Sequence, residues 1–336
     1  MTRQLNLILI TATVLMISCG DAEEQFFIFP GSAQGTTYSV TCESVPGISP
    51  SDIRDGVEEL LKRFDYSLST YNPESLLSAV NSNRDTVVDE TFRDVFLRAT
   101  EIWEMSDGLF DITAGPLINA WGFGPDAIKR FDESRLDSLM ELVGMEKVAI
   151  IEGKVVKKYP GMFLDMNAIA QGYSVDLISQ YLEAAGASNY LVEVGGEVFA
   201  RGKRGKRRWR VGIDRPTDNN IIAGSDLQAV IELENRALAT SGNYRRFYEE
   251  EGVKYSHTID PSTGYPVRHQ LLSATILADD CMTADAFATA CMAGGLEKAV
   301  EMIGKYPFLE GYLVYSDDEG NFLVWMSDPV RELIRE

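Results

Sequence analysis

The sequence predicts an α+β fold in which most strands pair as hairpins. Segments with strand-like alternation mostly follow one another across short turns and do not alternate singly with helices, which disfavours a doubly wound parallel sheet. Other segments carry apolar residues at spacings of three and four, which predicts amphipathic helices. The chain has 336 residues, a length that suits one large domain or two interlocked lobes and allows a sizeable core.

The first half of the chain begins with a strand and continues with helices. Alternating Thr, Tyr and Val predict the strand, helical spacing of apolar residues predicts three helices, and Glu152-Gly153 predicts the turn of a hairpin. Gly108 follows the second helix, as is common at helix ends. These elements are expected at residues 35–42 (strand), 51–68, 91–106 and 132–142 (helices) and 147–158 (hairpin).

A long helix opens the second half, and strands dominate the remainder of the chain. The helix is expected to begin near Asn167 and to end at Gly186. A later helix is expected to begin near Thr283 and to end at Gly294-Gly295, before a further helix and strand pair. Strands are expected between these helices at residues 190–201, 208–214, 226–233, 253–259 and 271–278.

The charge of the chain is strongly acidic. Asp and Glu number 51 against 31 Lys and Arg, which gives a formal net charge of −20. An acidic body repels phosphate backbones, so nucleic acid is not expected as a partner. The run at 201–210 is the one cationic patch, which we interpret as a solvated hairpin loop. A docking patch for an acidic partner or for anionic lipid is the alternative.

The first twenty residues have the pattern of an export signal. Arg3 precedes a mostly apolar run at 5–17, which is too short for a comfortable membrane span. Ser18-Cys19 follows, and a small residue before Cys resembles the bacterial lipoprotein signal. We therefore predict a lipoprotein signal peptide at 1–18, lipidation of Cys19 and a tether at 19–34. An ordinary signal peptide and an uncleaved anchor are the alternatives.

The remaining cysteines do not form a metal-binding pattern. Cys42, Cys281 and Cys291 make no Cys-x-x-Cys pair, and the chain has only two His residues. Zinc and iron–sulfur sites are therefore not expected. Spacing alone leaves open whether any two of these cysteines form a disulfide.

Two Gly-containing segments in the middle of the chain could approach a ligand. Residues 165–173 (Asp-Met-Asn-Ala-Ile-Ala-Gln-Gly-Tyr) stand at a strand-to-helix junction, and a helix N-terminus favours phosphate. The alternative is a tightly packed helix start capped by Asn167. Gly195-Gly196, inside a strand pattern, indicates either a structural bulge or a close approach of another group to the backbone.

Two later segments carry side chains suited to catalysis. His257 precedes Thr-Ile-Asp-Pro-Ser-Thr-Gly, whose turn chemistry would hold it at a strand end, where it could act as a base or be an ordinary structural His. Asp285 and Thr289 lie four apart on a helix, so their oxygens share one face. Such a pair suits Mg²⁺, although an acid in the first helical turn beside a packed Thr is an equal interpretation.

Together these segments resemble the ApbE family of FAD:protein FMN transferases, over nearly the whole chain after the signal. The resemblance extends to six further motifs, and their number and order make it specific: Gly35-Thr-Thr-Tyr38, Ser69-Thr-Tyr71, Phe110-Asp-Ile-Thr-Ala-Gly-Pro116, Trp121-Gly-Phe-Gly124, Ala239-Thr-Ser-Gly242 and Ala293-Gly-Gly295. It implies two interlocked α+β lobes with mixed, hairpin-rich sheets, and a single catalytic unit at 35–336.

The resemblance also implies the site residues. The family's metal ligands correspond to Asp285, Thr289 and the main-chain oxygen of Ala168, and its implicated base corresponds to His257. Its flavin contacts correspond to Tyr71, Phe110, Asp111, Asp165, Gln171 and Ile259. Gln171 stands where many relatives carry Lys or Glu.

These residues suit phosphoryl transfer. Mg²⁺ would neutralise phosphate charge, and His257 would take the proton of an incoming hydroxyl. The sequence therefore predicts a Mg²⁺-dependent enzyme that uses FAD as substrate, attaches FMN to a Ser or Thr of an acceptor protein and releases AMP. A membrane redox subunit is the expected acceptor, at the periplasmic face of the inner membrane. A metal-dependent FAD pyrophosphatase and a non-catalytic flavin-binding lipoprotein are the alternatives.

Overall fold

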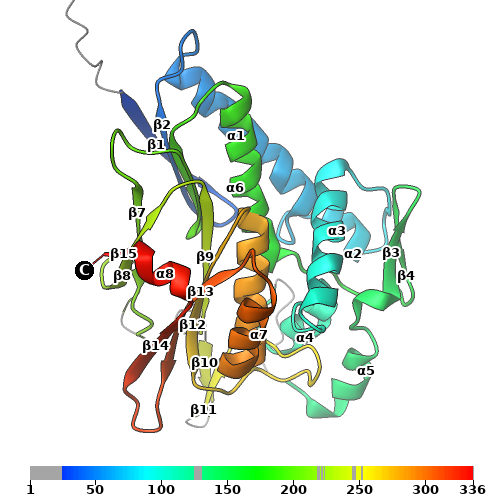
Figure 1. The fold of residues 1–336 in the computed structure, drawn as a ribbon. Helices are drawn as coiled ribbons and strands as arrows, with labels where there is room; N and C mark the ends of the chain where they lie inside the picture. The colour runs from blue at the N-terminus through cyan, green and yellow to red at the C-terminus, as the bar shows by residue number, and fades with distance from the viewer. Residues whose placement is uncertain are drawn as a thin grey trace, which may run out of the picture.

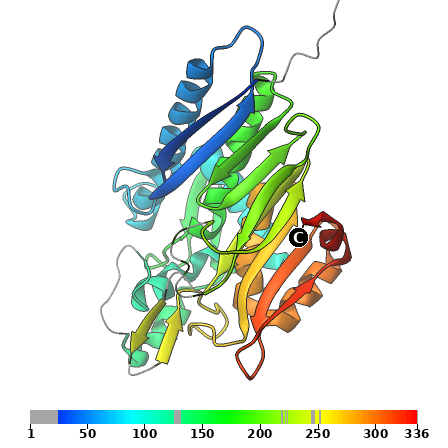
Figure 2. The ribbon, with the colours of Figure 1, turned by 90° about the vertical axis from the view of Figure 1, so that its left-hand side faces the viewer.

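A computed structural model describes residues 25–335, apart from 125–130, 218–219, 221, 223, 244–246 and 251–252. An eight-stranded sheet crosses the molecule, with the strand order β1-β2-β5-β6-β9-β12-β13-β14 (Figure 2). Its strands are β1 (Phe26–Ala33), β2 (Thr36–Glu43), β5 (Tyr190–Val194), β6 (Glu197–Arg201), β9 (Arg236–Gly242), β12 (Leu271–Ala278), β13 (Glu310–Ser316) and β14 (Phe322–Met326).

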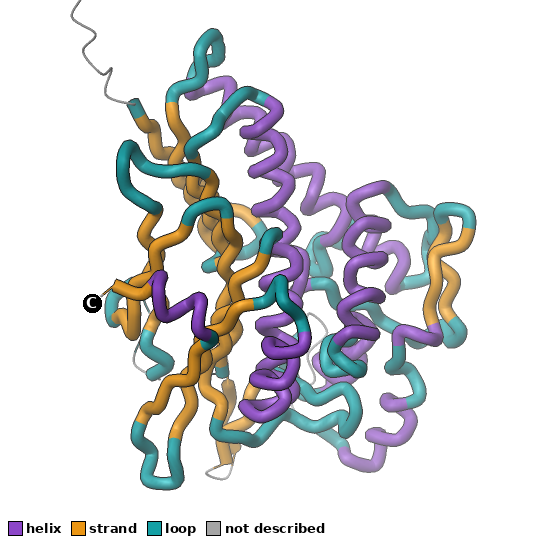
Figure 3. Tube along the Cα trace, in the orientation of Figure 1, coloured by secondary structure: helices purple, strands orange, loops and turns teal. Residues whose placement is uncertain are grey.

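Helices cover one face of this sheet in two layers. Figure 1 shows α6 (Asn167–Ala184) and α7 (Cys281–Lys305) end to end against the strands, with α1 (Pro50–Leu68), α2 (Leu76–Asn81) and α3 (Glu90–Met105) outside them. Figure 3 shows the same separation of strands from helices. The helix α7 contains a break at Gly295, whose φ of 77° and ψ of 179° are not helical.

A smaller sheet covers part of the other face. It has the order β15-β8-β7, with β7 (Trp209–Asp214), β8 (Leu227–Leu233) and β15 (Ile334–Arg335), and α8 (Asp328–Leu333) packs beside it. Trp209, Ile231 and Leu233 of this sheet form a buried cluster with Leu238 and Tyr312 of the large sheet.

A third region consists of short elements that connect α3 to α6. It contains η1 (Ile112–Ala114), α4 (Gly115–Ala120), η2 (Glu133–Arg135), α5 (Leu136–Met140), η3 (Met145–Lys147) and the hairpin of β3 (Val148–Ile151) and β4 (Lys154–Lys157). The hairpin of β10 (Phe247–Glu250) and β11 (Val253–Ser256) precedes the His257 segment. Ile259 of that segment is buried in one cluster with residues of α4 and α5.

The α+β fold class predicted from the sequence is confirmed. The strand pairings of the described residues are antiparallel, so the expected mixed sheets are wrong in that detail. The largest buried cluster includes residues from Phe29 to Leu313, and two smaller buried clusters lie outside it. The expected tether at 19–34 is wrong for residues 26–33, which form β1 because they pair along the whole of β2.

The remaining predictions about the N-terminal segment lie outside the described residues. These are the signal peptide at 1–18 and the lipidated Cys19. Within the described ranges, no helix is long and apolar enough to cross a membrane. Cys42, Cys281 and Cys291 are buried free thiols, which answers the question of a disulfide among them.

Candidate functional site

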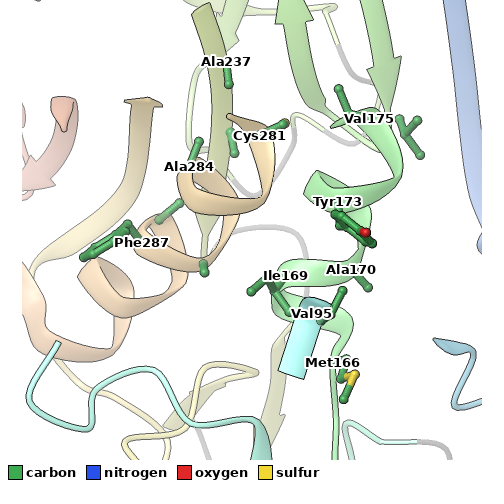
Figure 4. Packing of buried hydrophobic residues seen from close by; sticks show 14 of the residues in the cluster. Val95, Met166, Ile169, Ala170, Tyr173, Val175, Ala237, Cys281, Ala284 and Phe287 are labelled. Carbon is green, nitrogen blue, oxygen red and sulfur yellow. The ribbon is translucent and has the colours of Figure 1, made fainter. Parts of the chain in front are cut away.

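The start of α7 is attached to the start of α6 by a hydrogen bond from Gly172. Its main-chain N–H donates to Oδ2 of Asp285 across 3.0 Å. The helices approach so closely that a Cβ on residue 172 would lie 2.4 Å from the carbonyl oxygen of Cys281. Gly172 is therefore required by packing at this point. Figure 4 shows the first turns of α7, with Cys281 and Ala284, facing the first turns of α6, with Ile169 and Tyr173.

A second hydrogen-bonded carboxylate joins the same two helices, but this one belongs to α6 and accepts from α7. Asp176 of α6 is buried, and its two oxygens accept hydrogen bonds from the main-chain N–H groups of Cys281 (2.7 Å) and Met282 (2.8 Å). These are among the N–H groups that a helix start leaves without internal partners. Asp280 caps the same helix by accepting from the N–H of Thr283. The position of Asp285 is thus set by contacts in both directions between α6 and α7.

The three metal ligands expected from the sequence belong to the two helices that meet at this junction. In an α-helix the N–H of residue 172 points at the carbonyl oxygen of residue 168. Because that N–H also donates to Asp285, the carboxylate of Asp285 and the carbonyl of Ala168 lie on the same side of α6. Thr289 follows Asp285 by one helical turn and is half-buried.

The donor set consists of hard oxygens. Within the described residues, no three His, Cys, Asp or Glu side chains cluster as metal ligands. One carboxylate, one hydroxyl and one carbonyl form a different kind of set, which suits a Mg²⁺ ion that takes its other ligands from water and phosphate. The residues therefore fit the ion that the sequence predicted.

Burial raises the pKa of both carboxyl groups at this junction. The pKa of Asp285 rises to about 7, mainly through burial, and the N–H of Gly172 opposes the rise. The pKa of Asp176 rises to about 8, also mainly through burial, with Asp280 and Asp285 as further negative neighbours. A cation at this point would favour the ionised forms of both groups.

A second group of predicted residues lies at the entrance to α6. The N–H of Asp165 donates to the carbonyl of Ile112 across 2.7 Å, which places the loop before α6 against η1. The strand expected directly before this helix is absent from the described residues, because β4 ends at Lys157. Asp111 caps η1 by accepting from the N–H and hydroxyl of Thr113. Burial raises the pKa of Asp165, and it raises the pKa of Asp111 to about 6.

The α6 entrance also contacts the segment of Tyr71. The side chain of Asn167 lies 3.4 Å from the hydroxyl of Thr70, and the neighbouring Tyr71 is 65% exposed. An exposed aromatic ring beside a helix start could stack on a planar ligand. The alternative interpretation of Asn167 as the cap of α6 is wrong, because the N-cap is Met166 and Asp165 accepts from the N–H of Asn167.

Gln171 reaches across to the turn between β5 and β6. The segment expected as one strand at 190–201 is a tight hairpin, because Gly195 and Gly196 adopt φ values of 67° and 112°. A Cβ on Gly195 would lie 2.7 Å from Nε2 of Gln171, so the Gln171 side chain lies close against this glycine. The N–H of Gly195 also donates to the carbonyl of Thr37, which ties in the β1–β2 hairpin.

His257 stands at the end of β11, as expected, and is half-buried. Its ring meets the ring of Phe123 edge-on, with centroids 6.3 Å apart. Asn243, just beyond β9, accepts hydrogen bonds from the hydroxyls of Ser256 and Thr258 on either side of it. The following turn is fixed by Trp121, whose Nε1–H donates to the carbonyl of Gly264 across 2.8 Å.

Two predicted flavin contacts are core residues in this structure. Phe110 is 2% exposed and Ile259 is 6% exposed, and each belongs to a buried cluster. In this arrangement a flavin could touch them only through the main chain. Sequence reasoning also missed Asp176. Its signal was present, since it is the one Asp in a helix whose other residues are mostly apolar or small.

Comparison with known proteins identifies the family of the chain. The sequence model of the ApbE family matches residues 34–313, which is most of the chain. The chain belongs to the ApbE family. The FAD:protein FMN transferase of Vibrio cholerae is 35% identical over 322 residues, which are 93% of this chain and 94% of that relative. The enzyme of the same name from Haemophilus influenzae is 33% identical over 95% of each chain.

Solved structures of the ApbE family share the fold. The flavin transferase ApbE from Vibrio cholerae superposes with a TM-score of 0.83 and 31% identity, covering 92% of this chain and 99% of that one. The flavinyl transferase ApbE from Pseudomonas stutzeri, in its apo form, superposes with a TM-score of 0.81 and 30% identity, covering 92% and 97%. The resemblance stated from the sequence is thereby confirmed.

Proposed function

We propose that this protein cuts FAD, transfers the FMN half to a Ser or Thr hydroxyl of an acceptor protein and releases AMP. Its relatives named FAD:protein FMN transferase match it over almost their whole length. The structural observation that carries the proposal is the hydrogen bond between Gly172 and Asp285. It supports a site in which the buried carboxylate of Asp285 and the carbonyl of Ala168 share one side of α6, where a helix start can also receive phosphate.

The metal would be held by Asp285, Thr289 and the main-chain oxygen of Ala168. When bound, Mg²⁺ would neutralise negative charge on the pyrophosphate of FAD. The chain itself supplies little positive charge for that purpose, since its net charge is −20. Asp176 would keep the Asp285 helix in position by holding the first N–H groups of α7.

FAD would lie along the entrance to α6. Tyr71 offers an exposed ring for stacking, and Asp111, Asp165 and Gln171 offer polar groups. In the reaction, the acceptor oxygen forms a bond to the phosphorus of the FMN half. The bond from that phosphorus to the bridging oxygen breaks, and the bridging oxygen leaves with AMP.

His257 would take the proton of the acceptor hydroxyl. Its place at a strand end, between two residues hydrogen-bonded to Asn243, gives it a fixed main chain. A neutral imidazole held in this way can serve as a general base. Phe123 packs against the ring and limits its rotation.

We also propose that Cys19 carries lipid and holds the protein at the periplasmic face of the inner membrane. The short apolar run before Ser18-Cys19 supports this location. A membrane redox subunit facing the same compartment is the expected acceptor. The acidic body makes nucleic acid an unsuitable partner.

One incubation tests the reaction. The protein is mixed with FAD, Mg²⁺ and a candidate periplasmic acceptor, and the acceptor is examined by mass spectrometry. Covalent FMN on a Ser or Thr, together with AMP, is expected, and an acceptor with that residue changed to Ala is the control. Free FMN and AMP without labelling would show an FAD pyrophosphatase instead. Bound but uncut FAD would show a flavin-binding protein without catalysis.

A further inference from the structure

The turn between β6 and β7 concentrates positive charge on an acidic protein. Residues 201–210, here named the cationic turn, contain seven of the 31 Lys and Arg residues of the chain. Residues 203–208 are exposed, and Arg204 pairs with Arg207 through the main chain at the tip of the turn. Gly205, with a φ of 63°, allows this tight turn.

Acidic neighbours neutralise only the base of the cationic turn. Lys203 and Arg208 both lie within 3.4 Å of Glu234, Arg210 pairs with Glu232, and Arg201 pairs with Glu183. Among the described residues, Arg204, Lys206 and Arg207 at the tip have no ion-pair partner. A solvated loop explains their exposure, but it does not explain an unbalanced cluster on a chain of net charge −20.

The unpaired tip borders a groove lined by arginine. Arg204, Arg207, Arg208 and Arg210 surround a groove of about 400 Å³ whose other walls are Thr41, Leu191 and Trp209. Guanidinium groups bind phosphate oxygens in a two-pronged geometry. The groove therefore suits a phosphate diester with an apolar portion.

The N-terminal strand begins at this same place. The ring of Phe26, the first residue of β1, meets Trp209 edge-on at 5.7 Å, and the Arg204 guanidinium lies 6.0 Å from the Phe26 ring. Cys19 precedes Phe26 by seven residues. Seven residues reach at most about 25 Å, so a lipid on Cys19 would keep the cationic turn within about that distance of the bilayer.

We propose that the cationic turn is a docking surface for anionic lipid headgroups. It would hold the body of the enzyme against the membrane in one orientation. The Arg201–Glu183 pair places the turn at the C-terminal end of α6. The expected metal ligand Ala168 lies 15 residues before Glu183 on the same helix, about 22 Å away. The turn can therefore contact a bilayer without closing the site.

Vesicle binding tests the proposal without the anchor. The chain beginning at residue 19 with Cys19→Ser, which carries neither the apolar signal segment nor an acyl group, is sedimented with vesicles of phosphatidylcholine alone or with added phosphatidylglycerol. Binding is expected only with phosphatidylglycerol, and it should weaken with salt. Each Lys or Arg near an anionic surface contributes about fivefold, so Arg204→Gln/Lys206→Gln/Arg207→Gln should lower the partition coefficient by about 10²-fold.

A second triple variant controls for net charge. Lys62→Gln/Lys154→Gln/Lys158→Gln removes three exposed cations elsewhere, two of them around the β3–β4 hairpin, which lies across the molecule from β7 (Figure 1). This control should bind like the parent. Equal losses in both triple variants, or no loss in the first, would overturn the proposal. Binding to soluble polyglutamate with none to vesicles would do the same and would identify an acidic protein as the partner.

The proposal rests on the lipid anchor and is separable from flavin transfer. Both triple variants should keep the parent's thermal unfolding temperature and its rate of FAD cleavage in solution, because the ion pairs and the ring contact described for the cationic turn involve no candidate site residue. Vesicle binding without flavin transfer would reject the proposed reaction alone. Flavin transfer without charge-dependent vesicle binding would reject the docking surface alone.

Discussion

Oδ2 of Asp285 lies 3.0 Å from the main-chain nitrogen of Gly172, so a carboxylate of α7 is bonded to the second turn of α6. The two residues are 113 positions apart in the chain. This contact joins the helix that begins with the expected carbonyl ligand to the helix that carries the expected carboxylate and hydroxyl. Its consequences can be tested by changing each partner.

Asp285→Asn should abolish metal-dependent FAD cleavage while the fold survives. The amide oxygen can still accept from Gly172, so the free energy of unfolding should stay within about 1 kcal/mol of the parent value. Asp285→Ala should lose the same activity and about 1–3 kcal/mol more stability, because a buried N–H is left unpaired. Mg²⁺ binding by calorimetry and FAD consumption are the measurements. An Asn variant that cleaved FAD at the parent rate would remove the metal assignment.

Thr289 offers a matched pair for the same site. Thr289→Ser keeps the hydroxyl and should keep Mg²⁺ binding, whereas Thr289→Val keeps the shape and should weaken it. Similar affinities for the two variants would show that this hydroxyl is not a ligand.

Asp176→Ala should loosen the metal site from a distance. It removes the acceptor for two buried N–H groups of α7, at a cost of about 2–6 kcal/mol in the free energy of unfolding. Mutation of a residue that positions a metal ligand typically lowers metal affinity by about 10- to 100-fold, and we expect a loss of Mg²⁺ affinity in that range. Asp176→Asn keeps one acceptor oxygen, so its stability and its Mg²⁺ affinity should lie between those of the parent and those of Asp176→Ala. Unchanged Mg²⁺ affinity in a folded Asp176→Ala protein would limit Asp176 to a structural role.

His257→Ala should separate flavin binding from flavin transfer. FAD should still bind, since its expected contacts come from other segments, but transfer should fall by about 10²–10⁴-fold. The parent rate should rise with pH through the range where an imidazole loses its proton. Equal transfer rates at saturating FAD would mean that His257 is not the base.

His269 is a useful comparison for His257, but its substitution should affect stability. Its Nε2 lies 2.8 Å from the carbonyl of Met292, to which it must donate, and a Cβ on Gly295 would lie 3.0 Å from its ring. His269 therefore holds the break in α7. His269→Ala should lower the unfolding temperature and leave the transfer rate of the folded enzyme nearly unchanged. A transfer defect as large as that of His257→Ala would contradict this division of roles.

The metal-free protein should lose stability as the pH rises. The pKa of Asp176 in the fold, about 8, exceeds its ordinary value of 3.8. Its stabilising contribution is therefore present below pH 3.8 and is lost as the pH rises through about 8. The unfolding temperature should fall between about pH 4 and pH 8. Asp176→Asn should reduce the slope of unfolding temperature against pH. Asp55→Asn, which changes a carboxylate 67% exposed, should leave that slope unchanged. Equal slopes in the parent and Asp176→Asn would count against the raised pKa.

Cys19→Ala should release the protein from the membrane and leave the signal peptide unprocessed at that position. The reason is that the lipidated Cys is both the anchor and the first residue after cleavage in the lipoprotein pathway. Fractionation and mass spectrometry of the N-terminus are the measurements. Unchanged membrane association and processing would show that Cys19 is not the anchor.

Local sequence was sufficient to predict those helices and hairpins whose own residues show a clear periodicity or turn motif. The helix at α1 follows from apolar spacing behind a Ser49 capping box, and the β3–β4 hairpin follows from Glu152-Gly153, both of which adopt positive φ. The break in α7 was expected from Gly294-Gly295. The family and the fold class also followed from motifs, because these residues occur in a fixed order along the chain.

Long-range contacts decided the rest. β9, with the sequence Arg-Ala-Leu-Ala-Thr-Ser-Gly, has little intrinsic preference for strand, and it forms one because β6 and β12 pair with it on both sides. β1 was taken as tether although its first four residues, Phe-Phe-Ile-Phe, favour a strand, and its pairing with β2 shows that it is one. The roles of Asp176 and Gly172 depend on N–H and carboxylate groups more than a hundred residues away. The sequence by itself determined which chemical groups the protein possesses and where helices begin. Only the tertiary structure decided which of these groups meet, because hydrogen bonds between distant segments leave no periodic pattern in either one.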